Sequence, residues 1–331
     1  MNYIGMDIHK KFTVAVVKDV EGNLLQEEKF DNDEFAFRKF LMIYHPNETK
    51  IVIESTCVWE YIYEILEELS YEVKLSNPTR TKAIAYARIK TDSVDASTLA
   101  DLLRANLIPE SYISLKHIRL LREITRERRT FVKQTTQIKN KIHAILIKRG
   151  WKLPNVSLCK SAIIWIRDKA EASDILLHYL DLLEYHTKML QTIESKIKNI
   201  ADTNKEAQLL MTIPGIAEIR AMDIVAEIGQ INRFQTADKL CSYAGLVPAI
   251  RQSGDTLQFG RLIRQASRTL KYVLIETCWN LVRTRESNQL QEFYKKLVKK
   301  KGKQKAICAT ARKLCCIVHA MLRKGEEFRY S

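Results

Sequence analysis

The chain is poor in the residues that interrupt regular structure. Its 331 residues include only 10 glycines and 6 prolines, so long stretches are free to form helices. No hydrophobic run approaches the roughly 20 residues that cross a bilayer, and the sequence opens without a basic and apolar leader. We therefore expect a helix-rich protein of the cytoplasm that has no membrane partner.

The cysteine patterns of disulfide scaffolds and zinc sites are also missing. The seven cysteines are odd in number, contain no Cys-x-x-Cys pair and include the neighbours Cys315 and Cys316, which cannot easily bridge to each other. The seven histidines show no metal spacing, and the chain has no P-loop for ATP. These absences favour a reduced protein that uses neither zinc nor ATP.

Acidic residues become scarce after residue 110. Residues 1–110 hold 13 Lys+Arg and 19 Asp+Glu, whereas residues 111–331 hold 41 and 20, a net charge of +21. Such a field attracts polyanions such as nucleic acid, with acidic substrates or anionic lipids as alternatives, and a solvated basic surface kept for solubility is a further alternative. The candidate nucleic-acid ligands are Arg126, Arg128, Arg129, Lys133, Lys139, Lys141, Arg251, Arg261, Arg264 and Arg268.

The first hundred residues alternate between strand-like and helix-like patterns. Strands are predicted over residues 3–9, 12–18 and 24–30, as an antiparallel meander, and over 51–53 and 72–75. Helical patterns cover residues 33–44, 59–69 and 92–105. Three strands followed by alternating helices and strands predict a mixed α/β sheet covered by helices, which is the order of ribonuclease-H-like nuclease folds.

The remainder of the chain is predicted to be mainly helical. Apolar spacing predicts one long basic helix between Pro109 and Pro154 and another over 175–200, which pair antiparallel or form a coiled coil between subunits. Half of the glycines fall within residues 215–260, where we expect sharp turns or close backbone approaches. Residues 209–228, with Pro-Gly between two helical stretches, fit a phosphate-binding helix-hairpin-helix or a plain helix turn. We predict three parts, namely an α/β domain over 1–108, a basic helical region over 109–205 and a mainly α domain over 206–331.

Four carboxylates of the first part are candidate catalytic metal ligands. Asp7 lies inside the first strand, Glu54 ends the strand 51–53, and Asp92 and Asp95 share a helix face because they are three residues apart. If the two strands are neighbours and the helix crosses their ends, the four converge as oxygen ligands for Mg²⁺, with Mn²⁺ as the alternative ion. Taken singly they have structural explanations, since Asp92 suits a helix N-cap and Asp95 favours the helix dipole.

Several motifs resemble those of DEDD insertion-sequence transposases, relatives of the pilin-gene invertases. They are Tyr-Ile-Gly-Met-Asp-Ile-His-Lys at 3–10, Val-Ile-Glu-Ser-Thr at 52–56, Lys-Thr-Asp-Ser-Val-Asp-Ala at 90–96, Thr-Ile-Pro-Gly-Ile at 212–216, Tyr-Ala-Gly-Leu-Val-Pro at 243–248 and Gln-Ser-Gly at 252–254. The resemblance implies an N-terminal ribonuclease-H-like (RuvC-like) domain whose ligands are Asp7, Glu54, Asp92 and Asp95. It also implies a C-terminal transposase domain with a nucleophilic serine, which corresponds to Ser253. The chain departs from the family at Ala266-Ser267, where a Gly-Asn or Gly-Ser pair is usual.

The same resemblance implies an activity. It is that of a DNA recombinase that cuts and rejoins strands with magnesium through a transient phosphoserine link and therefore needs no ATP. It further implies a structured guide RNA and assembly as dimers or tetramers. The alternatives are a resolvase-like two-metal endonuclease, which hydrolyses DNA without a covalent link, and a non-catalytic repressor that binds nucleic acid.

Overall fold

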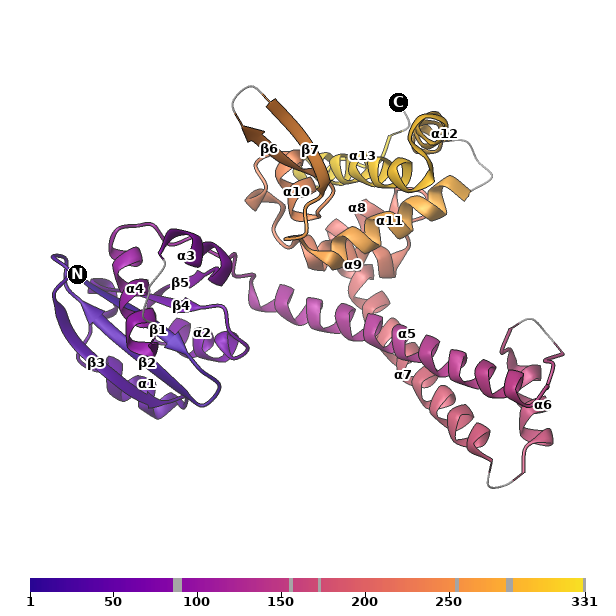
Figure 1. Ribbon diagram of the computed structural model, residues 1–331, viewed down its shortest axis with the longest axis horizontal. Coiled ribbons are helices and arrows are strands. Elements are labelled where there is room, and N and C mark those ends of the chain that lie inside the picture. The colour runs from indigo at the N-terminus through magenta and orange to yellow at the C-terminus, as the bar shows by residue number, and fades with distance from the viewer. Residues whose placement is uncertain (86–90, 155–156, 172–173, 254–255, 284–287, 330–331) are drawn as a thin grey trace. The chain divides into compact units, whose positions relative to one another are not determined.

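The computed structural model describes most of the chain. The described residues are 1–85, 91–154, 157–171, 174–253, 256–283 and 288–329, with Ser253 described by its backbone alone. They form two compact units, Met1–Ile113 (unit 1) and Ser114–Ser331 (unit 2), whose elements are labelled in Figure 1. Within these ranges no helix combines the length and the apolar character that a membrane span requires. The division into three parts stays a prediction.

Unit 1 is built around a five-stranded mixed sheet in the order β3-β2-β1-β4-β5. The antiparallel strands are β1 (Asn2–Ile8), β2 (Phe12–Lys18) and β3 (Leu24–Asp31). The strands β4 (Thr49–Glu54) and β5 (Glu72–Ser76) run parallel to β1. The predicted mixed α/β class and the meander are confirmed, and each predicted strand lies within two residues of its expected bounds.

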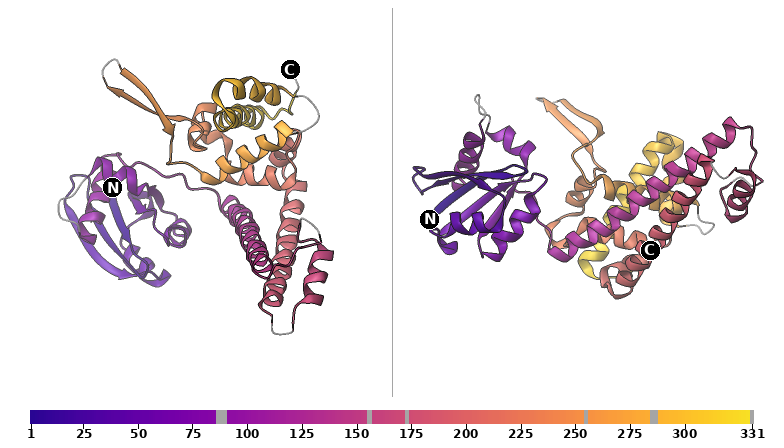
Figure 2. Two further views of the ribbon diagram at one scale, coloured as in Figure 1. Left: turned by 45° about the vertical axis from the view of Figure 1, so that its right-hand side comes forward. Right: turned by 90° about the horizontal axis from the view of Figure 1, so that it is seen from below.

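Helices cover both faces of this sheet, as Figures 1 and 2 show. Apolar residues of α1 (Glu34–Leu41) and α2 (Trp59–Glu68) pack in one core with Ile4, Met6 and Ile8 of β1 and with Ile51 and Ile53 of β4. The opposite face carries α4 (Asp92–Arg104), whose Leu99 and Leu103 pack on Val52. A short helix, α3 (Pro78–Ile84), and a 3₁₀ turn, η1 (Pro46–Glu48), complete the unit and were not predicted.

The helix α4 lies close against β1 because Gly5 has no side chain. A Cβ atom added at Gly5 would overlap the backbone oxygen of Ala96 and crowd the backbone nitrogen of Ala100. A helix and a strand approach this closely only where the intervening residue is glycine. The contact fixes the position of α4 over the sheet, so that the first turn of the helix lies beside the end of β1.

Unit 2 contains the two long helices that the apolar spacing predicts. They are α5 (Lys116–Lys148) and α7 (Ile175–Thr203), which lie side by side in both views. Ile142 of α5 packs near Leu180 of α7, and Leu121 shares a core with Ile197, so the helices are antiparallel within one chain. The short helix α6 (Lys160–Lys169) packs where the C-terminal part of α5 meets the N-terminal part of α7. It was not predicted.

The C-terminal helices enclose a second apolar core. They are α8 (Lys205–Met211), α9 (Glu218–Ile228), η2 (Ile231–Arg233), α10 (Ala237–Tyr243), α11 (Arg268–Arg283), α12 (Gln289–Lys301) and α13 (Lys303–Lys324). The mainly helical character is as predicted. The hairpin of β6 (Pro248–Ser253) and β7 (Thr256–Leu262) was not, and it projects from the helices in Figure 2.

Candidate functional site

The carboxyl ends of β1 and β4 meet at one edge of the sheet in unit 1. Met6 pairs with Ile53, so Asp7 and Glu54 follow at the same level on neighbouring parallel strands. Met6 and Ile53 point into the core under α1 and α2, and successive side chains of a strand point to opposite faces. Asp7 and Glu54 therefore lie on the face that α4 covers.

The first turn of α4 brings the other two predicted ligands to this edge. Thr91 is the N-cap, and its Oγ1 accepts from the Val94 backbone at 3.2 Å, so the suggestion that Asp92 is the cap is wrong. Asp92 is the first residue of the helix, and its Oδ1 lies 3.2 Å from Nε2 of His9. Asp95 lies in the same turn, close enough for its charge to raise the pKa of Asp7.

Asp7 is the buried member of this group, with 7% of its surface exposed. Burial is the largest cause that raises its pKa, and the charges of Asp95 and Asp92 raise it further. Contact with His9, whose Nε2 lies 3.2 Å from Oδ2 of Asp7, lowers it in part. A buried carboxylate beside two other carboxylates is unfavourable unless a cation shares the site.

These residues fit a divalent cation. Asp7, His9 and Asp92 each offer one ligand atom, and the three atoms lie within 4.8 Å of one another. Carboxylate oxygens suit Mg²⁺ and Mn²⁺, and an imidazole nitrogen is a further ligand for a transition metal. The excess of negative charge around Asp7 gives such an ion a reason to bind.

From the sequence no histidine was expected at a metal-binding spacing, so His9, which lies between Asp7 and Asp92, was not identified. Asp7 and His9 are two residues apart at the end of a strand, which places both side chains on the same side of the sheet. The His9 backbone oxygen accepts from Nδ2 of Asn32 at 2.7 Å, and Oδ1 of Asn32 accepts from Thr13 at 2.6 Å. The ring also lies against Phe12, with centroids 4.6 Å apart. An Asp-x-His pattern in a strand was the signal available in the sequence.

The predicted nucleophile lies in the other unit. Ser253 is the last residue of β6, and its backbone pairs with Thr256 of β7. Its side chain and Gly254 lie outside the described residues. The four arginines predicted nearby are exposed, on the strands of the hairpin, in the loop after it and at the start of α11, as Arg251, Arg261, Arg264 and Arg268. The role of Ser253 stays a prediction.

Unit 2 has a basic cleft of about 920 Å³ between α5, α9 and α11. Its charged lining residues are Arg126, Arg128, Arg129, Lys133, Arg220, Asp223 and Glu276. The first four of these cations were predicted as nucleic-acid ligands from the basic pattern of α5. Lys139 and Lys141 lie further along α5 and are exposed.

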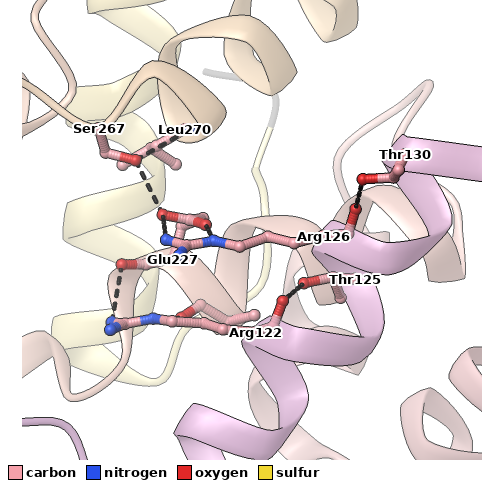
Figure 3. Close-up of polar contacts among 8 residues, drawn as sticks. Arg122, Thr125, Arg126, Thr130, Glu227, Ser267 and Leu270 are labelled. Atoms are coloured by element: carbon pink, nitrogen blue, oxygen red, sulfur yellow. Dashed lines mark hydrogen bonds and ion pairs between the residues drawn. The ribbon is translucent and has the colours of Figure 1, made fainter. Parts of the chain in front are cut away.

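Two of the predicted arginines already hold carboxylates of the same chain. Arg126 donates from Nε to Oε1 of the fully buried Glu227 at 2.8 Å and from Nη2 to Oε2 at 3.2 Å, as Figure 3 shows. This hydrogen bonding raises the pKa of Arg126. Arg128 lies 2.7 Å from a carboxylate oxygen of Glu194. Arg129 and Lys133 have no carboxylate partner among the described residues, which leaves them available for an anion.

Asp223 is a second buried acid of α9, with 4% of its surface exposed. Among the described residues its Oδ1 has no hydrogen-bond partner. Burial raises its pKa to about 6, although the charges of Arg128, Arg129 and Arg220 lower it in part, and Glu227 adds to the rise. Neither the pKa nor the burial of Asp223 was predicted from the sequence.

We expect the Asp223→Asn variant to be more stable than the wild type above pH 6, by about 2 kcal/mol. The pKa in the folded state, about 6, is higher than the ordinary value of 3.8, so ionisation favours unfolding across this interval. The full rise corresponds to roughly 3 kcal/mol, from which the cost of a buried amide is subtracted. Denaturant unfolding at pH 4 and pH 7.5 measures the effect. A gain that is equal at both pH values would contradict it.

Comparison with known proteins agrees with the motifs in both units. The IS110-type DEDD transposase model matches residues 4–148, and the model of the transposase IS116/IS110/IS902 family matches residues 207–295. The first match contains all four predicted ligands, and the second contains Ser253 and the α9 and α11 walls of the basic cleft.

Relatives of the chain include transposases of insertion sequences and pilin gene-inverting proteins. The transposase of insertion sequence element IS1328 from Yersinia enterocolitica is 21% identical, with 98% of each chain covered. The pilin gene-inverting protein of Moraxella bovis is 27% identical, with 98% of this chain and 97% of the relative covered. The transposase of insertion sequence element IS1111A from Coxiella burnetii is 23% identical, over 84% of this chain and 79% of its own. With both family models matched in order and relatives aligned along nearly its whole length, the chain belongs to the IS110 family of transposases.

Proposed function

We propose that the protein is the recombinase of an insertion sequence, which cuts and rejoins DNA strands through a phosphoserine link. The observation that carries the proposal is that carboxylate oxygens of Asp7 and Asp92 both lie 3.2 Å from Nε2 of His9. Asp95 is close enough for its charge to raise the pKa of Asp7. The family assignment supports it independently. The strand order of unit 1 further supports a ribonuclease-H-like fold for the metal-binding domain.

The metal ligands of the proposal are Asp7, Glu54, Asp92 and Asp95. A divalent cation bound there, Mg²⁺ by preference, supplies positive charge that stabilises the phosphate oxygens in the transition state. Asp7 supplies a carboxylate at the edge of the sheet. The capped first turn of α4, Thr91 to Asp95, fixes the positions of Asp92 and Asp95 relative to Asp7. His9 lies between Asp7 and Asp92, with its Nε2 3.2 Å from a carboxylate oxygen of each, and could add a nitrogen ligand to the same ion.

The covalent step balances without an external energy source. The Oγ of Ser253 forms a bond to the DNA phosphorus while the bond from phosphorus to one sugar oxygen breaks. The serine proton passes to solvent, and the departing sugar oxygen takes up a proton to become a hydroxyl group. Rejoining reverses these events with a hydroxyl of another strand, so the number of phosphate ester bonds is conserved and ATP is not required.

The basic surface supports nucleic-acid partners for this reaction. We propose DNA of the element ends and the target as substrate, a structured guide RNA that selects both, and an assembly of two or four chains. The net charge of +21 after residue 110 and the cleft between α5, α9 and α11 support the binding of phosphate backbones. The helix turn at Pro214-Gly215, with Gly215 at φ +80°, is compatible with both a helix-hairpin-helix and a plain turn.

The Ser253→Ala variant tests the covalent step against hydrolysis. The measurement is the amount of protein–DNA adduct that survives denaturing electrophoresis, together with strand cleavage, on element-junction DNA with Mg²⁺ and the flanking noncoding RNA. We expect Ser253→Ala to lose both adduct and cleavage, and Ser242→Ala, an exposed serine of α10, to keep both. Cleavage without adduct in Ser253→Ala would instead identify a resolvase-like nuclease. DNA processing that is indifferent to Mg²⁺ would favour a non-catalytic binder.

A further inference from the structure

The basic cleft of unit 2 contains a group that a simple phosphate site does not need. Asp223 lines the cleft, is 4% exposed and has an Oδ1 atom without a hydrogen-bond partner among the described residues. A buried carboxylate repels phosphate and destabilises the fold unless something donates to it. The ligand of this cleft should therefore carry hydrogen-bond donors as well as negative charge.

A flat surface lies in the same cleft. Tyr272, on α11, is 54% exposed. The guanidinium of Arg129, on α5, lies over the Tyr272 ring, 5.0 Å from the ring centroid. Aromatic rings and guanidinium planes are the surfaces on which unpaired bases stack. Both groups line the cleft that Asp223 lines, so a stacked base has a carboxylate within the same space.

The cleft also offers positive charge for the backbone of such a ligand. Lys133 and Arg220 line it, and Lys133 has no carboxylate partner among the described residues. The first turn of α9 contributes Ala217, Ile219 and Arg220 to the lining, and no side chain caps this helix end. Free N–H groups at a helix N-terminus bind phosphate oxygens. The volume of about 920 Å³ lies within the roughly 300–1,000 Å³ of small-ligand sites.

We propose that this cleft binds one unpaired guanine nucleotide, whose base stacks on Tyr272 and Arg129 and donates to Asp223. Guanine alone presents two adjacent donors, N1–H and N2–H, one for Oδ1 of Asp223, which has no partner among the described residues, and one for the second oxygen of the same carboxylate. Adenine and cytosine present a donor beside an acceptor, and uracil or thymine presents a donor between two acceptors. An ionised carboxylate repels those acceptors, so the other bases bind less well.

This inference goes beyond the proposed recombinase chemistry and does not depend on it. It concerns residues of unit 2 alone, whereas the metal ligands belong to unit 1. The Asp7→Asn variant separates the two claims, because it should lose strand cleavage and keep guanine binding.

The test is fluorescence anisotropy with the full-length protein and short single strands. One oligo(U) strand carries a single central guanine, and its partner carries inosine, which lacks the N2 amino group. A matching oligo(dT) pair and free 5′-GMP against 5′-IMP identify the source of the guanine as RNA, DNA or a free nucleotide. We expect guanine to bind about tenfold more tightly than inosine in at least one of these pairs, since one hydrogen bond to a charged group is lost. Equal binding of guanine and inosine in all three pairs would overturn the proposal.

Two variants connect the preference to the carboxylate. Asp223→Asn should reduce the ratio of guanine to inosine affinity to about one, because an amide offers one acceptor in place of two. Asp202→Asn, an exposed acid of α7 outside the cleft lining and with the same change of charge, should keep the ratio. A guanine preference that persists in Asp223→Asn, or that Asp202→Asn abolishes equally, contradicts the assignment. Thermal unfolding of both variants verifies that each is folded.

Discussion

The Asp7→Asn variant is expected to lose at least about 100-fold in strand-cleavage rate while its apoprotein is no less stable than the wild type. Loss of even an outer partner of a metal ligand typically costs 10–100-fold, so loss of a ligand should cost more. The stability argument follows from the pKa of Asp7, which is raised in the folded state. At pH values above that pKa, ionisation favours the unfolded chain, and the uncharged amide removes this penalty. A residue that is retained only for structure would show the opposite pattern.

The measurement combines cleavage kinetics with thermal unfolding in the presence and absence of Mg²⁺. Mg²⁺ should raise the unfolding temperature of the wild type, since a ligand of the folded state stabilises it, and should have little effect on Asp7→Asn. The matched control is Asp101→Asn, another acid of α4, which pairs with Lys18 at 2.6 Å outside the cluster. The control should keep its activity. Cleavage by Asp7→Asn within about tenfold of the wild type would remove the metal-site claim.

Local patterns predicted most of unit 1 because its strands and helices carry distinct residue types and clear start signals. Short runs of β-branched and apolar residues mark β1 and β2, and the N-cap at Asp33 marks the start of α1, independently of the rest of the chain. The helix α3 was not predicted, although Asn77-Pro78 carries a helix-start signal. In the structure Asn77 is an N-cap whose side chain accepts from Arg80, and Pro78 occupies the first helical position, where proline is favoured.

The β6–β7 hairpin was missed for a different reason. Its apolar residues do not face a core, since Ile250, Leu257 and Phe259 are exposed. A hydrophobic pattern that depends on burial therefore has nothing to detect. The remaining signal was the Gly-Asp pair at 254–255 between two runs of β-forming residues, which favours a tight turn.

The positions of Asp7 and Glu54 on neighbouring strands were predictable from the sequence, whereas the cleft was not. Asp7 and Glu54 follow neighbouring parallel strands, so strand order alone brings them together. Asp223 and Glu227 instead lie in a stretch of α9, residues 221–228, in which every side chain is buried. Which charged groups face them depends on how α5 and α11 pack, and sequence spacing contains no information about that packing.

The Arg126→Met variant is expected to destabilise unit 2 by about 3–5 kcal/mol, more than Glu227→Gln does. The side chain of Glu227 is 0% exposed, whereas that of Arg126 is 55% exposed. Without Arg126, a buried carboxylate loses its bidentate partner and keeps the hydroxyl of Ser267, at 2.8 Å. Without the charge of Glu227, the guanidinium can still be hydrated by solvent, so we expect a cost of about 1–2 kcal/mol.

Denaturant unfolding followed by tryptophan fluorescence measures this difference, because Trp151, Trp165 and Trp279 all lie in unit 2. The double variant Arg126→Met/Glu227→Gln closes the cycle and should recover part of the stability, since it leaves no buried charge. If Arg126→Met and Glu227→Gln lowered the free energy of unfolding equally, the claim that Arg126 compensates the buried charge of Glu227 would be wrong. The hydroxyl of Ser267 also accepts from the Leu270 backbone at 3.2 Å, so this one carboxylate links α5 and α9 to the first turn of α11. These three helices form the walls of the basic cleft. We therefore expect Arg126→Met to weaken nucleic-acid binding in the cleft as well, because the helices pack less firmly and not because a phosphate contact is lost.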